Sequence, residues 1–425
     1  MESWFKNQPM KYFVCILLGF QIHAASAQRN CGSADYWKQQ LQSDAALNSR
    51  YMQIEASSRH HAAMKIQEPA VEDGSTITVP VVVHILYNTS AQNISDAQVQ
   101  LQLNVLNQDF QKSNEDIGKV PAAFAGYAAD CQIKFVLAKT DPQGYATTGI
   151  IRKKTTQSSW KQDDRMKYSM NGGDDAWDSR YYLNIWVCNL ADGLLGYSTF
   201  PGAAADKDGV VIRTDVFGPG NNAVYNKGRT ATHEIGHWLN LKHLWGDADC
   251  GSDDVEDTPP QKTYSSGCSS FPKITAGSCN NNPDGDMFMN FMDFSDDACI
   301  LMFTYGQRQR MRAIFTADGP RASMRNSPAL GKPWNNAPAA DSAKHTGNPI
   351  SLSVYPNPSA NTIYFRDGNE SSIIPDHYQI FDAKGQLLMS GFKRPAVQIN
   401  RLMQGIYFIR VQYDGKDAVI RFMKQ

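Results

Sequence analysis

The sequence lacks a marked excess of charge of either sign, and it lacks long apolar runs after its first residues. Its 425 residues include 41 lysines and arginines and 42 aspartates and glutamates, for a net charge of -1. This balance provides no global attraction to nucleic acid or to anionic lipid. Beyond residue 27, no stretch approaches the roughly 18 apolar residues of a transmembrane helix. We therefore expect neither a nucleic-acid partner nor a membrane span in the mature protein.

The composition also excludes wholesale disorder, a coiled coil and collagen. Hydrophobic residues make up 42% of the chain, which carries 31 glycines, as in an ordinary globular protein. At 425 residues the chain exceeds the usual length of one domain, which predicts two or three units.

The first residues have the features of an export signal. Lys6 and Lys11 supply positive charge, residues 12–22 are apolar, and residues 25–27 read Ala-Ser-Ala, a typical cleavage site. We predict a signal peptide over residues 1–27, with a retained N-terminal helix as the alternative. A secreted or cell-surface location, reached through the periplasm, is expected.

Cysteine is scarce, and its number becomes odd once the signal peptide is removed. Cys15 leaves with that peptide, so seven cysteines remain where disulfides form and persist. At least one thiol must stay unpaired or find another partner. Cys131 and Cys188 lie on expected strands, where they either pair or remain buried free thiols.

Changes in residue pattern divide the exported chain into four parts. Residues 28–75 are polar and hold no catalytic cluster, which suits a removable pro-segment. Strand and helix patterns alternate over residues 76–316 and predict an α+β domain with a mixed sheet. Residues 317–349 are rich in Ala, Asn, Pro, Ser and Gly, as linkers are, and β-rich runs over residues 350–425 predict an all-β sandwich. Expected strands of the α+β domain span residues 77–87, 133–138, 149–155, 183–190 and 209–213, and a helix spans residues 95–112.

The segment HEIGHWLNLKH, which begins at His233, has the spacing of a zinc site. On a helix, His233 and His237 project from one face and can bind the same ion. His243 can join them only if the chain turns sharply, and Asn240 tolerates the left-handed backbone of such a turn. Three histidines leave one position open for water, as in catalytic zinc sites. Glu234, beside the metal, would take a proton as that water attacks a peptide bond.

This segment resembles the long zinc motif of the metzincin clan, and its flanks resemble the pappalysin family. HEIGHWLN, Asp257-Thr258-Pro259 and the later MNFMD at residues 289–293 carry the resemblance, which covers about residues 76–316. It implies a metzincin-like catalytic domain, with a twisted mixed sheet, helices and a zinc cleft between two subdomains. It also implies that Met292 lies beneath the zinc as the Met-turn.

Two residues depart from the family pattern. Asn240 stands where the usual residue is glycine, and Phe294 stands where related enzymes often have a tyrosine near the metal. Phenylalanine cannot donate a hydrogen bond to an oxyanion, so Phe294 is left out of the catalytic set.

The resemblance further implies two disulfides, Cys250–Cys279 and Cys268–Cys299, across a long irregular segment. It also implies that Asp297 lies at the base of the S1′ pocket, where a carboxylate would pair with an arginine at P1′ of the substrate. The alternative is that Asp297 is an ordinary solvated loop charge.

Cys31-Gly32 resembles the cysteine switch of metzincin zymogens, in which a thiolate occupies the fourth zinc position. A disulfide with an unknown partner is the alternative. If arginine is preferred at P1′, the bond between Ser58 and Arg59 would be a site of self-processing.

The loop between Asp247 and Thr258 is crowded with carboxylates. Hard oxygen ligands on such a loop suit calcium, and the pappalysin resemblance implies a calcium site in this region, whereas a simply soluble acidic loop is the alternative. Candidate ligands are Asp253, Asp254, Asp257 and Thr258.

The end of the chain resembles the C-terminal sorting domains of the type IX secretion system of Bacteroidetes. Tyr355-Pro356-Asn357-Pro358, the segment FDAKGQ at residues 381–386 and Gly405-Ile406-Tyr407 carry this resemblance. It implies that the secretion machinery is a partner. A substrate-binding β-sandwich is the alternative.

These features together predict a secreted zinc endopeptidase that acts on proteins or peptides and is made as a latent zymogen. Two other functions stay open. One is a catalytically weak zinc-binding adhesin or decoy, which Asn240 and Phe294 allow although Glu234 is intact. The other is a zinc amidase with a non-protein substrate.

Overall fold

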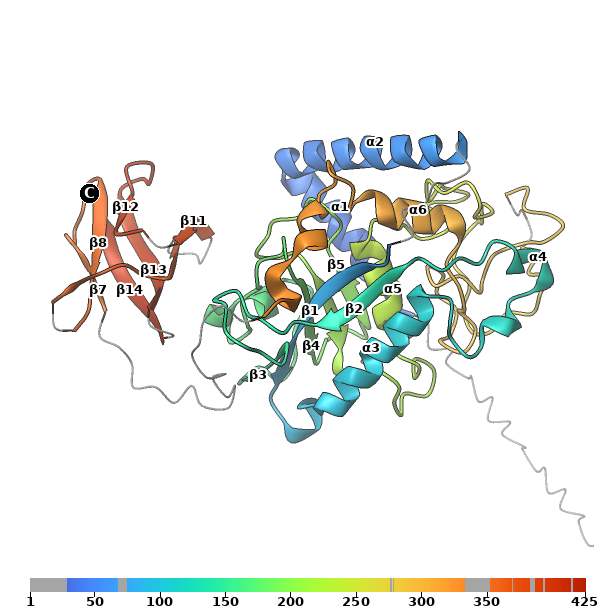
Figure 1. Cartoon of the computed structure of the whole chain (residues 1–425), viewed down its shortest axis with the longest axis horizontal. Coiled ribbons are helices and arrows are strands. Elements are labelled where there is room, and N and C mark those ends of the chain that lie inside the picture. Colours follow the sequence, from blue (N-terminus) through green and yellow to red (C-terminus); the bar gives the residue numbers. More distant parts are fainter. Residues whose placement is uncertain are drawn as a thin grey trace, which may run out of the picture. The chain divides into compact units, whose positions relative to one another are not determined.

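The computed structural model describes residues 29–67, residues 75–332 except 276 and 278, and residues 352–425 except 369, 383–386, 393, 414 and 415. The predicted signal peptide and most of the predicted linker lie outside these described residues. The chain divides into two compact units, Met1–Ala339 and Ala340–Gln425. Figure 1 colours the chain from blue to red along the sequence.

A mixed sheet forms the centre of the N-terminal unit. Its strands are β1 (Ile77–Tyr87), β2 (Ile133–Leu137), β3 (Ile150–Lys154), β4 (Leu183–Cys188), β5 (Gly196–Ser198) and β6 (Val210–Arg213). They follow the order β2-β1-β4-β6-β5, and β3 pairs with the second half of β1. β5 is antiparallel to β6, whereas the other pairs are parallel. β1 is almost wholly buried, as expected of a β-branched strand covered on both faces.

Helices complete this unit. The α-helices are α1 (Ser33–Ser43), α2 (Ala45–Gln67), α3 (Asp96–Phe110), α4 (Ala122–Ala125), α5 (Arg229–Trp238) and α6 (Tyr305–Ala313). Short 3-10 helices are η1 (Ser90–Gln92), η2 (Ile117–Lys119), η3 (Arg165–Lys167), η4 (Ser169–Asn171), η5 (Thr214–Val216), η6 (Ala322–Asn326) and η7 (Pro328–Leu330). None of the helices in the described part of the chain is long and apolar enough to cross a membrane.

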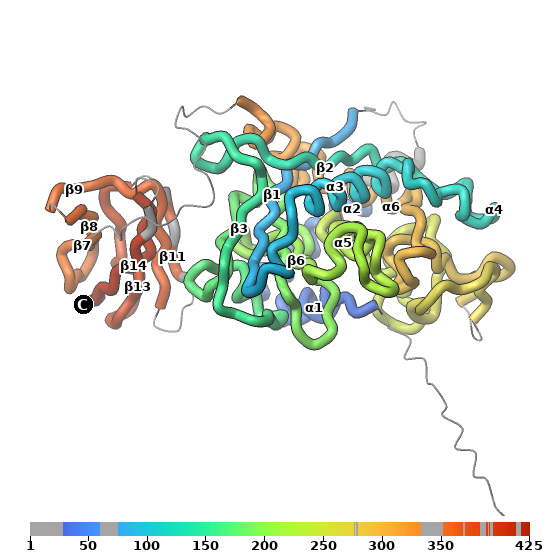
Figure 2. Tube along the Cα trace, turned by 90° about the horizontal axis from the view of Figure 1, so that it is seen from below, coloured from blue at the N-terminus to red at the C-terminus, as the bar shows by residue number. Residues whose placement is uncertain are grey.

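The core lies between the sheet and the pair α3 and α5. These two helices contact each other and lie side by side (Figure 2). Ser95 caps α3 by accepting a hydrogen bond from the backbone N–H of Gln98. Val99 and Leu103 of α3 share one apolar cluster with Ile235 of α5 and with the inward side chains of β1 and β4. This packing holds α5, which carries the predicted zinc ligands, rigidly against the sheet.

Residues 33–67 form the two helices α1 and α2 although their apolar residues follow helical spacing only loosely. A small aromatic cluster provides the contact: Trp37 stacks on Phe200 with ring centroids 5.5 Å apart, and Tyr51 packs edge-on against both rings. Because a few large side chains bury the contact, no continuous apolar stripe is needed. α2 lies against α6, as Figure 1 shows.

The N-terminal unit extends beyond residue 316, where composition predicted the linker to begin. Residues 317–332 pack onto this unit through η6 and η7, and Met324 is buried in its core. Arg321 forms a buried ion pair with Asp208 at 2.7 Å. The linker boundary at 317 is therefore wrong, because the small residues that are typical of linkers also form tight 3-10 turns.

The C-terminal unit is a sandwich of two antiparallel sheets. Its strands are β7 (Ser353–Tyr355), β8 (Thr362–Arg366), β9 (Ser372–Ile373), β10 (His377–Phe381), β11 (Leu387–Phe392), β12 (Ala396–Gln398), β13 (Gly405–Tyr413) and β14 (Lys416–Lys424). One sheet has the order β11-β10-β13-β14, and the other has the order β12-β8-β7 with β9 beside β8. Ile363 and Phe365 of one sheet share a core with Ile380 and Ile409 of the other. The predicted all-β sandwich is confirmed.

Candidate active site

Three histidines and one cysteine converge at the end of α5. The Nε2 atoms of His237 and His243 are 3.1 Å apart, and Cys31 Sγ lies 3.5 Å from His237 Nε2. One ligand atom from each of Cys31, His233, His237 and His243 lies within 4.8 Å of the other three. Within the described ranges, no second group of three or more His, Cys, Asp or Glu side chains converges in this way.

The outer nitrogen of each imidazole is engaged by an acceptor. His233 Nδ1 lies 2.7 Å from the carbonyl oxygen of Phe291, and His237 Nδ1 lies 2.8 Å from that of Leu241. A carbonyl can only accept a hydrogen bond, so Nδ1 of both rings carries the proton and Nε2 presents a lone pair to the centre. Such partners fix the ring orientation of metal-binding histidines.

The inner side of the cluster fits a divalent cation. His233 Nε2 is buried without a hydrogen-bond partner among the described residues, and an orphaned buried acceptor requires an explanation. Burial and the neighbouring His243 lower the pKa of His237 to about 3, and the pKa of His233 is lowered by burial and by both neighbours. The rings of His233 and His237 are thus neutral, as zinc ligands must be.

A sharp turn after α5 brings the third histidine back. Asn240 has φ 76°, in the left-handed region, which confirms the backbone predicted for this position. The backbone N–H of Leu241 then donates to the carbonyl of Gly236 at 2.9 Å. Outside the turn, His243 Nδ1 lies 2.5 Å from Asp247 Oδ1, so this ring is also oriented from behind.

Met292 lies directly beneath α5. Its side chain is fully buried, and a Cβ built on Gly236 would stand only 2.5 Å from Met292 Sδ. The glycine inside the HEIGH motif therefore allows the methionine to approach the helix between His233 and His237.

Glu234 is buried beside the histidines. Ser33 Oγ donates a hydrogen bond of 2.6 Å to Glu234 Oε2, and the residue is only 1% exposed. Burial raises the pKa of Glu234 to about 7, although Ser33 and Cys31 act in the opposite direction. The carboxyl group is thus poised to gain or lose a proton near neutral pH.

The chain around Cys31 adds to the edge of the sheet. The backbone N–H of Gly32 donates to Gly196 O at 3.0 Å, and that of Leu195 donates to Asn30 O at 2.9 Å. Cys31 and Gly196 form a parallel bridge, so this segment runs in the same direction as β5. The backbone pairing places the thiol of Cys31 at the histidine cluster.

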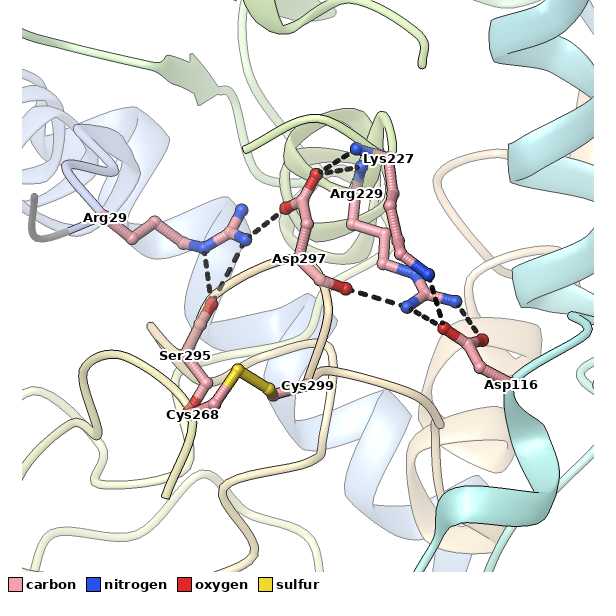
Figure 3. Close-up of a disulfide and its surroundings, with 8 residues drawn as sticks. All are labelled: Arg29, Asp116, Lys227, Arg229, Cys268, Ser295, Asp297 and Cys299. Atoms are coloured by element: carbon pink, nitrogen blue, oxygen red, sulfur yellow. Dashed lines mark hydrogen bonds and ion pairs between the residues drawn. A yellow bond between two sulfur atoms is a disulfide. The ribbon is translucent and has the colours of Figure 1, made fainter. Parts of the chain in front are cut away.

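Asp297 holds a guanidinium from the N-terminal segment (Figure 3). Arg29 Nη2 lies 2.6 Å from Asp297 Oδ1, and both side chains are almost fully buried. The other carboxylate oxygen accepts hydrogen bonds from the backbone N–H groups of Lys227 and Arg229, at 2.8 and 3.3 Å. Arg29 also donates to the carbonyl oxygen of Ser295. Asp297 is thus an oriented buried carboxylate matched to a guanidinium.

Two disulfides lie in the segment that follows the histidines, and one aromatic ring packs against the histidine cluster. The structure contains the bonds Cys250–Cys279 and Cys268–Cys299, and the second lies beside Asp297 in Figure 3. Cys131 and Cys188 are buried free thiols, which decides between the two alternatives for this pair. Phe294 packs on His243 with ring centroids 4.8 Å apart and presents no donor to the site.

Residues 167–316 match the family model described as pregnancy-associated plasma protein-A, and residues 353–425 match that of the secretion system C-terminal sorting domain. An extracellular metalloprotease of Pyricularia oryzae is 33% identical over 252 residues, which are 57% of this chain and 76% of that protein. One of Arthroderma benhamiae is 31% identical over 304 residues, 69% of this chain and 92% of that protein.

The chain belongs to the pappalysin family of metzincin metalloproteases. Mature mirolysin of Tannerella forsythia in complex with a cleaved peptide is 49% identical, with a TM-score of 0.59, over 61% of this chain and 99% of that one. A mutant of promirolysin from the same organism is 45% identical, with a TM-score of 0.64, over 70% and 97% of the two chains. This pappalysin is a secreted zinc metalloendopeptidase with a type IX sorting domain at its C-terminus, and its metzincin-like α+β fold is confirmed.

The four candidate calcium ligands of the pappalysin do not converge as the histidines do. Thr258 Oγ1 donates to the buried carboxylate of Asp253 at 2.8 Å. Asp254 instead pairs with Lys242, and Asp257 accepts a hydrogen bond from Thr304 at 2.6 Å. The structure thus brings Asp253 and Thr258 together and directs the other two side chains elsewhere.

Sequence reasoning missed three residues of the N-terminal segment that contact the catalytic domain: Arg29, Ser33 and Tyr36, whose hydroxyl donates to Asp164 Oδ2 at 2.7 Å. Arg29 could have been found, because an arginine two residues before Cys31 matches the predicted preference of Asp297. Ser33 and Tyr36 are ordinary residues of a short helix, and only the fold shows which side chains of the catalytic domain they contact.

Proposed function

We propose that this pappalysin cleaves the peptide bond that precedes arginine, uses Glu234 as general base, and is held latent by residues 28–75 acting as a pro-segment. The observation that supports this proposal most strongly is the buried ion pair between Arg29 and Asp297 at 2.6 Å. Arg29, an arginine of the chain itself, pairs with the carboxylate that is predicted to select arginine in the substrate. Two residues further along the chain, Cys31 faces the histidine cluster.

The proposed chemistry depends on a base next to the ligand cluster. Zinc held by His233, His237 and His243 would polarise the scissile carbonyl and lower the pKa of the attacking water. Glu234 follows His233 on the same helix, so its carboxylate lies beside the ligand cluster, where it would accept a proton from water and pass it to the leaving amine. No other side chain is proposed to move a proton.

The preference for arginine follows from the surroundings of Asp297. Backbone N–H groups of Lys227 and Arg229 hold one oxygen of its carboxylate, so the other oxygen is directed at an incoming group. Arg229 donates further to the main-chain carbonyl of Asp297 at 2.8 Å and forms an ion pair with Asp116 at 2.6 Å. Such a rigid buried carboxylate favours a guanidinium over a neutral side chain.

The pro-segment would keep the enzyme latent because it covers the zinc ligands, the general base and the specificity pocket at the same time. Cys31 would supply the fourth zinc ligand, Ser33 caps Glu234 through a 2.6 Å hydrogen bond, and Arg29 fills the arginine pocket. The parallel pairing of Cys31 with Gly196 holds these three residues in register along β5. Removal of this segment would free all three positions together.

A second anchor of the pro-segment lies on α2. Glu55 forms a two-fold hydrogen-bonded ion pair with Arg310 of α6 at 2.6 and 2.7 Å, and both residues are buried. Asn240 Nδ2 donates to Ser58 Oγ at 3.3 Å. Because Ser58 and Arg59 lie within α2, self-processing at their bond requires local unfolding of the helix. The anchor would therefore delay activation.

The targeting and calcium assignments complete the proposal. We propose that residues 1–27 direct export, and that residues 350–425 engage the secretion machinery and take no part in catalysis.

We also propose that calcium binds near Asp253 and Thr258. Asp253 supports the calcium site because its buried carboxyl has a pKa raised by burial to about 7, and a bound cation would compensate that burial.

The decisive experiment is digestion of a peptide library by the processed protein, with cleaved bonds identified by mass spectrometry. Cleavage is expected before arginine, and Glu234→Ala should abolish it. Asp297→Asn should keep zinc and basal cleavage while reducing the arginine preference. Cuts without that preference would reject the pocket assignment, and absence of cleavage would favour the adhesin or decoy alternative. Activity confined to non-protein amides would favour the amidase.

Latency is tested separately on the full chain. Arg29→Ala and Cys31→Ala should each shorten the time to full activity, because each removes one of the masking contacts. Arg50→Ala is the matched control, since this arginine of α2 contacts only the carbonyl of Gly202 at 3.4 Å among the bonds described. Unchanged activation of both variants would contradict the masking role of the pro-segment.

A further inference from the structure

The pro-segment places a tyrosine in a largely apolar pocket of the catalytic domain that also holds a buried carboxylate. Tyr36 is only 4% exposed, and its hydroxyl donates a 2.7 Å hydrogen bond to Asp164 Oδ2. Its ring lies against Tyr197 with centroids 5.1 Å apart, and Lys167 Nζ lies 5.6 Å from the ring centre. Both the ring and the hydroxyl of Tyr36 are therefore specifically recognised.

The walls of this pocket also bond to one another. Asp164 forms an ion pair with Lys167 at 3.0 Å and accepts a hydrogen bond from the Tyr197 hydroxyl at 3.1 Å. Lys167 donates to the carbonyl of Lys207 at 2.8 Å and lies over the ring of Trp186. All of these residues belong to the catalytic domain, so we expect the pocket to persist after the pro-segment leaves.

Asp164 keeps its charge in a buried position. Its backbone has φ 62°, in the left-handed region that aspartate adopts more readily than most other residues. Burial disfavours its charge, but Lys167 and the hydrogen bond from Tyr36 hold the pKa of Asp164 below its ordinary value. A buried carboxylate thus remains charged at the point that receives the tyrosine hydroxyl.

Strand β5 connects the pocket with the site that holds the predicted zinc ligands. A Cβ on Gly196 would stand 3.0 Å from Glu234 Cγ, and the backbone N–H of Ser198 donates to Ser33 Oγ at 2.8 Å. Tyr197 lies between Gly196 and Ser198 on β5. Its side chain projects to the opposite face of the sheet, because side chains alternate along a strand. An extended peptide paired with this edge would present every second side chain to the Tyr197 face.

The pro-segment also indicates on which side of the scissile bond the pocket lies. Arg29 occupies the proposed S1′ pocket, Cys31 faces the zinc ligands, and Tyr36 comes after both along the chain. The pocket of Tyr36 is therefore on the other side of the metal from S1′, which is the side that receives residues before the scissile bond.

We propose that this pocket, formed by Asp164, Lys167, Trp186 and Tyr197, is a subsite of the mature enzyme that selects a tyrosine side chain before the scissile bond. The inference rests on the proposed function, in which the pro-segment leaves. Phenylalanine would fill the same space but leave the carboxylate of Asp164 without its hydroxyl donor. A cationic side chain is disfavoured, because Lys167 and Lys207 already lie 3.0 and 3.8 Å from that carboxylate.

The subsite is tested with matched peptides that carry arginine at P1′ and either tyrosine or phenylalanine at the second, third or fourth residue before the bond. The protein is the full chain after it has lost its pro-segment. At one position, tyrosine should raise kcat/KM about tenfold or more over phenylalanine, as a hydrogen bond to a charged group does. Asp164→Asn should reduce this ratio towards one, whereas Asp163→Asn, the neighbouring control, should keep it.

Equal rates for tyrosine and phenylalanine at all three positions, with the arginine preference intact, would overturn the subsite and leave the proposed function standing. Loss of all cleavage would instead overturn the proposed function. In that case a second measurement on the full chain still decides whether the pocket recognises a phenol.

In this second measurement, Tyr36→Ala removes a phenol ring from the full chain, and phenol or benzene is then added to fill the space. Phenol should raise the Tm more than benzene at equal concentration, because only phenol can donate to Asp164. Adding Asp164→Asn to Tyr36→Ala should remove the difference. Equal effects of the two compounds would overturn the recognition of a hydroxyl. If the alanine variant fails to fold, Tyr36→Phe is measured without added compounds: it should lower the Tm of the parent chain but not that of Asp164→Asn, and an unchanged Tm of the parent chain would overturn the proposal.

Discussion

The histidine cluster and the acidic loop between residues 247 and 258 were both predicted as metal sites, and they differ in how their ligand atoms are used. In the cluster, the outer nitrogens are engaged by protein acceptors, while His233 Nε2 is buried without a partner among the described residues. In the loop, Asp254 pairs with Lys242 and Asp257 accepts from Thr304. Ligand atoms that face one another without other partners are the stronger indication of a metal.

The contrast follows from local geometry. Helical spacing and one left-handed residue at Asn240 direct three imidazoles to one point. Successive residues of an irregular loop project in different directions, so four nearby carboxylate and hydroxyl groups need not meet. Only Asp253 and Thr258 do so here.

The largest expected effect is the loss of zinc from His243→Ala. Removal of one of three histidine ligands should reduce zinc from about one ion per chain to a small fraction, and abolish peptide cleavage. Metal analysis by mass spectrometry after gel filtration measures this. Asp253→Asn is the control from the other region and should retain its zinc; full zinc content in His243→Ala would contradict the ligand assignment.

Glu234→Gln should remove the general base without removing the zinc. The amide keeps the size of the side chain but cannot take a proton, so kcat should fall about 10²–10⁴-fold while zinc content stays unchanged. Steady-state kinetics on a peptide with arginine at P1′ provides the measurement. Retained kcat with zinc bound would show that another group supplies the base.

Gly236→Ala tests the packing that supports the cluster. The added Cβ would approach Met292 Sδ to 2.5 Å in a fully buried site, and such overpacking costs about 1–3 kcal/mol. The higher helix propensity of alanine, about 1 kcal/mol, offsets part of this cost. We expect a lower Tm and reduced zinc affinity.

Gly126→Ala is the matched control for this change, because nothing lies within 4 Å of the added Cβ and no positive φ is recorded there. Its Tm should stay close to that of the parent protein. Equal Tm values for the two variants would show that Met292 adjusts without cost.

The smallest effect concerns calcium and pH at Asp253. Its pKa is raised by burial to about 7, so the folded chain holds this proton more tightly than the unfolded chain. The proton on Asp253 therefore adds to the free energy of unfolding. This contribution is complete below about pH 4, and it is lost as the pH rises through about 7. Calcium should therefore raise the Tm at about pH 7.5 by a few degrees, about 2–4 °C per kcal/mol, and have little effect at about pH 4.5.

Asp253→Asn supplies the comparison, because Glu234 and Asp109 also have pKa values raised by burial, to about 7 and about 6. The variant should lose the calcium response and keep the pH dependence that these other groups produce. An equal calcium response in both proteins would place the ion elsewhere.

The periodicity of apolar residues in the sequence predicted several helices and strands. It missed elements that are stabilised by residues far away in the sequence. β1, α3 and β4 were predicted close to their observed bounds, because each shows a clear pattern of strand or helix residues. β5, a three-residue strand, was not predicted, since its Gly-Tyr-Ser sequence has no strand pattern and its pairing with β6 defines it. α6 was likewise missed, since its surface is strongly charged and its support comes from Arg310 and Glu55.

The sequence by itself determined that His233, His237 and His243 would converge beside Glu234 and that a sorting domain lies at residues 350–425, because these features depend on local spacing and pattern along the chain. Only the tertiary structure decided what the predicted pro-segment contacts. Arg29 and Asp297 are 268 positions apart, and Tyr36 and Asp164 are 128 apart. No local pattern records such pairs, because the fold alone brings them within hydrogen-bond distance.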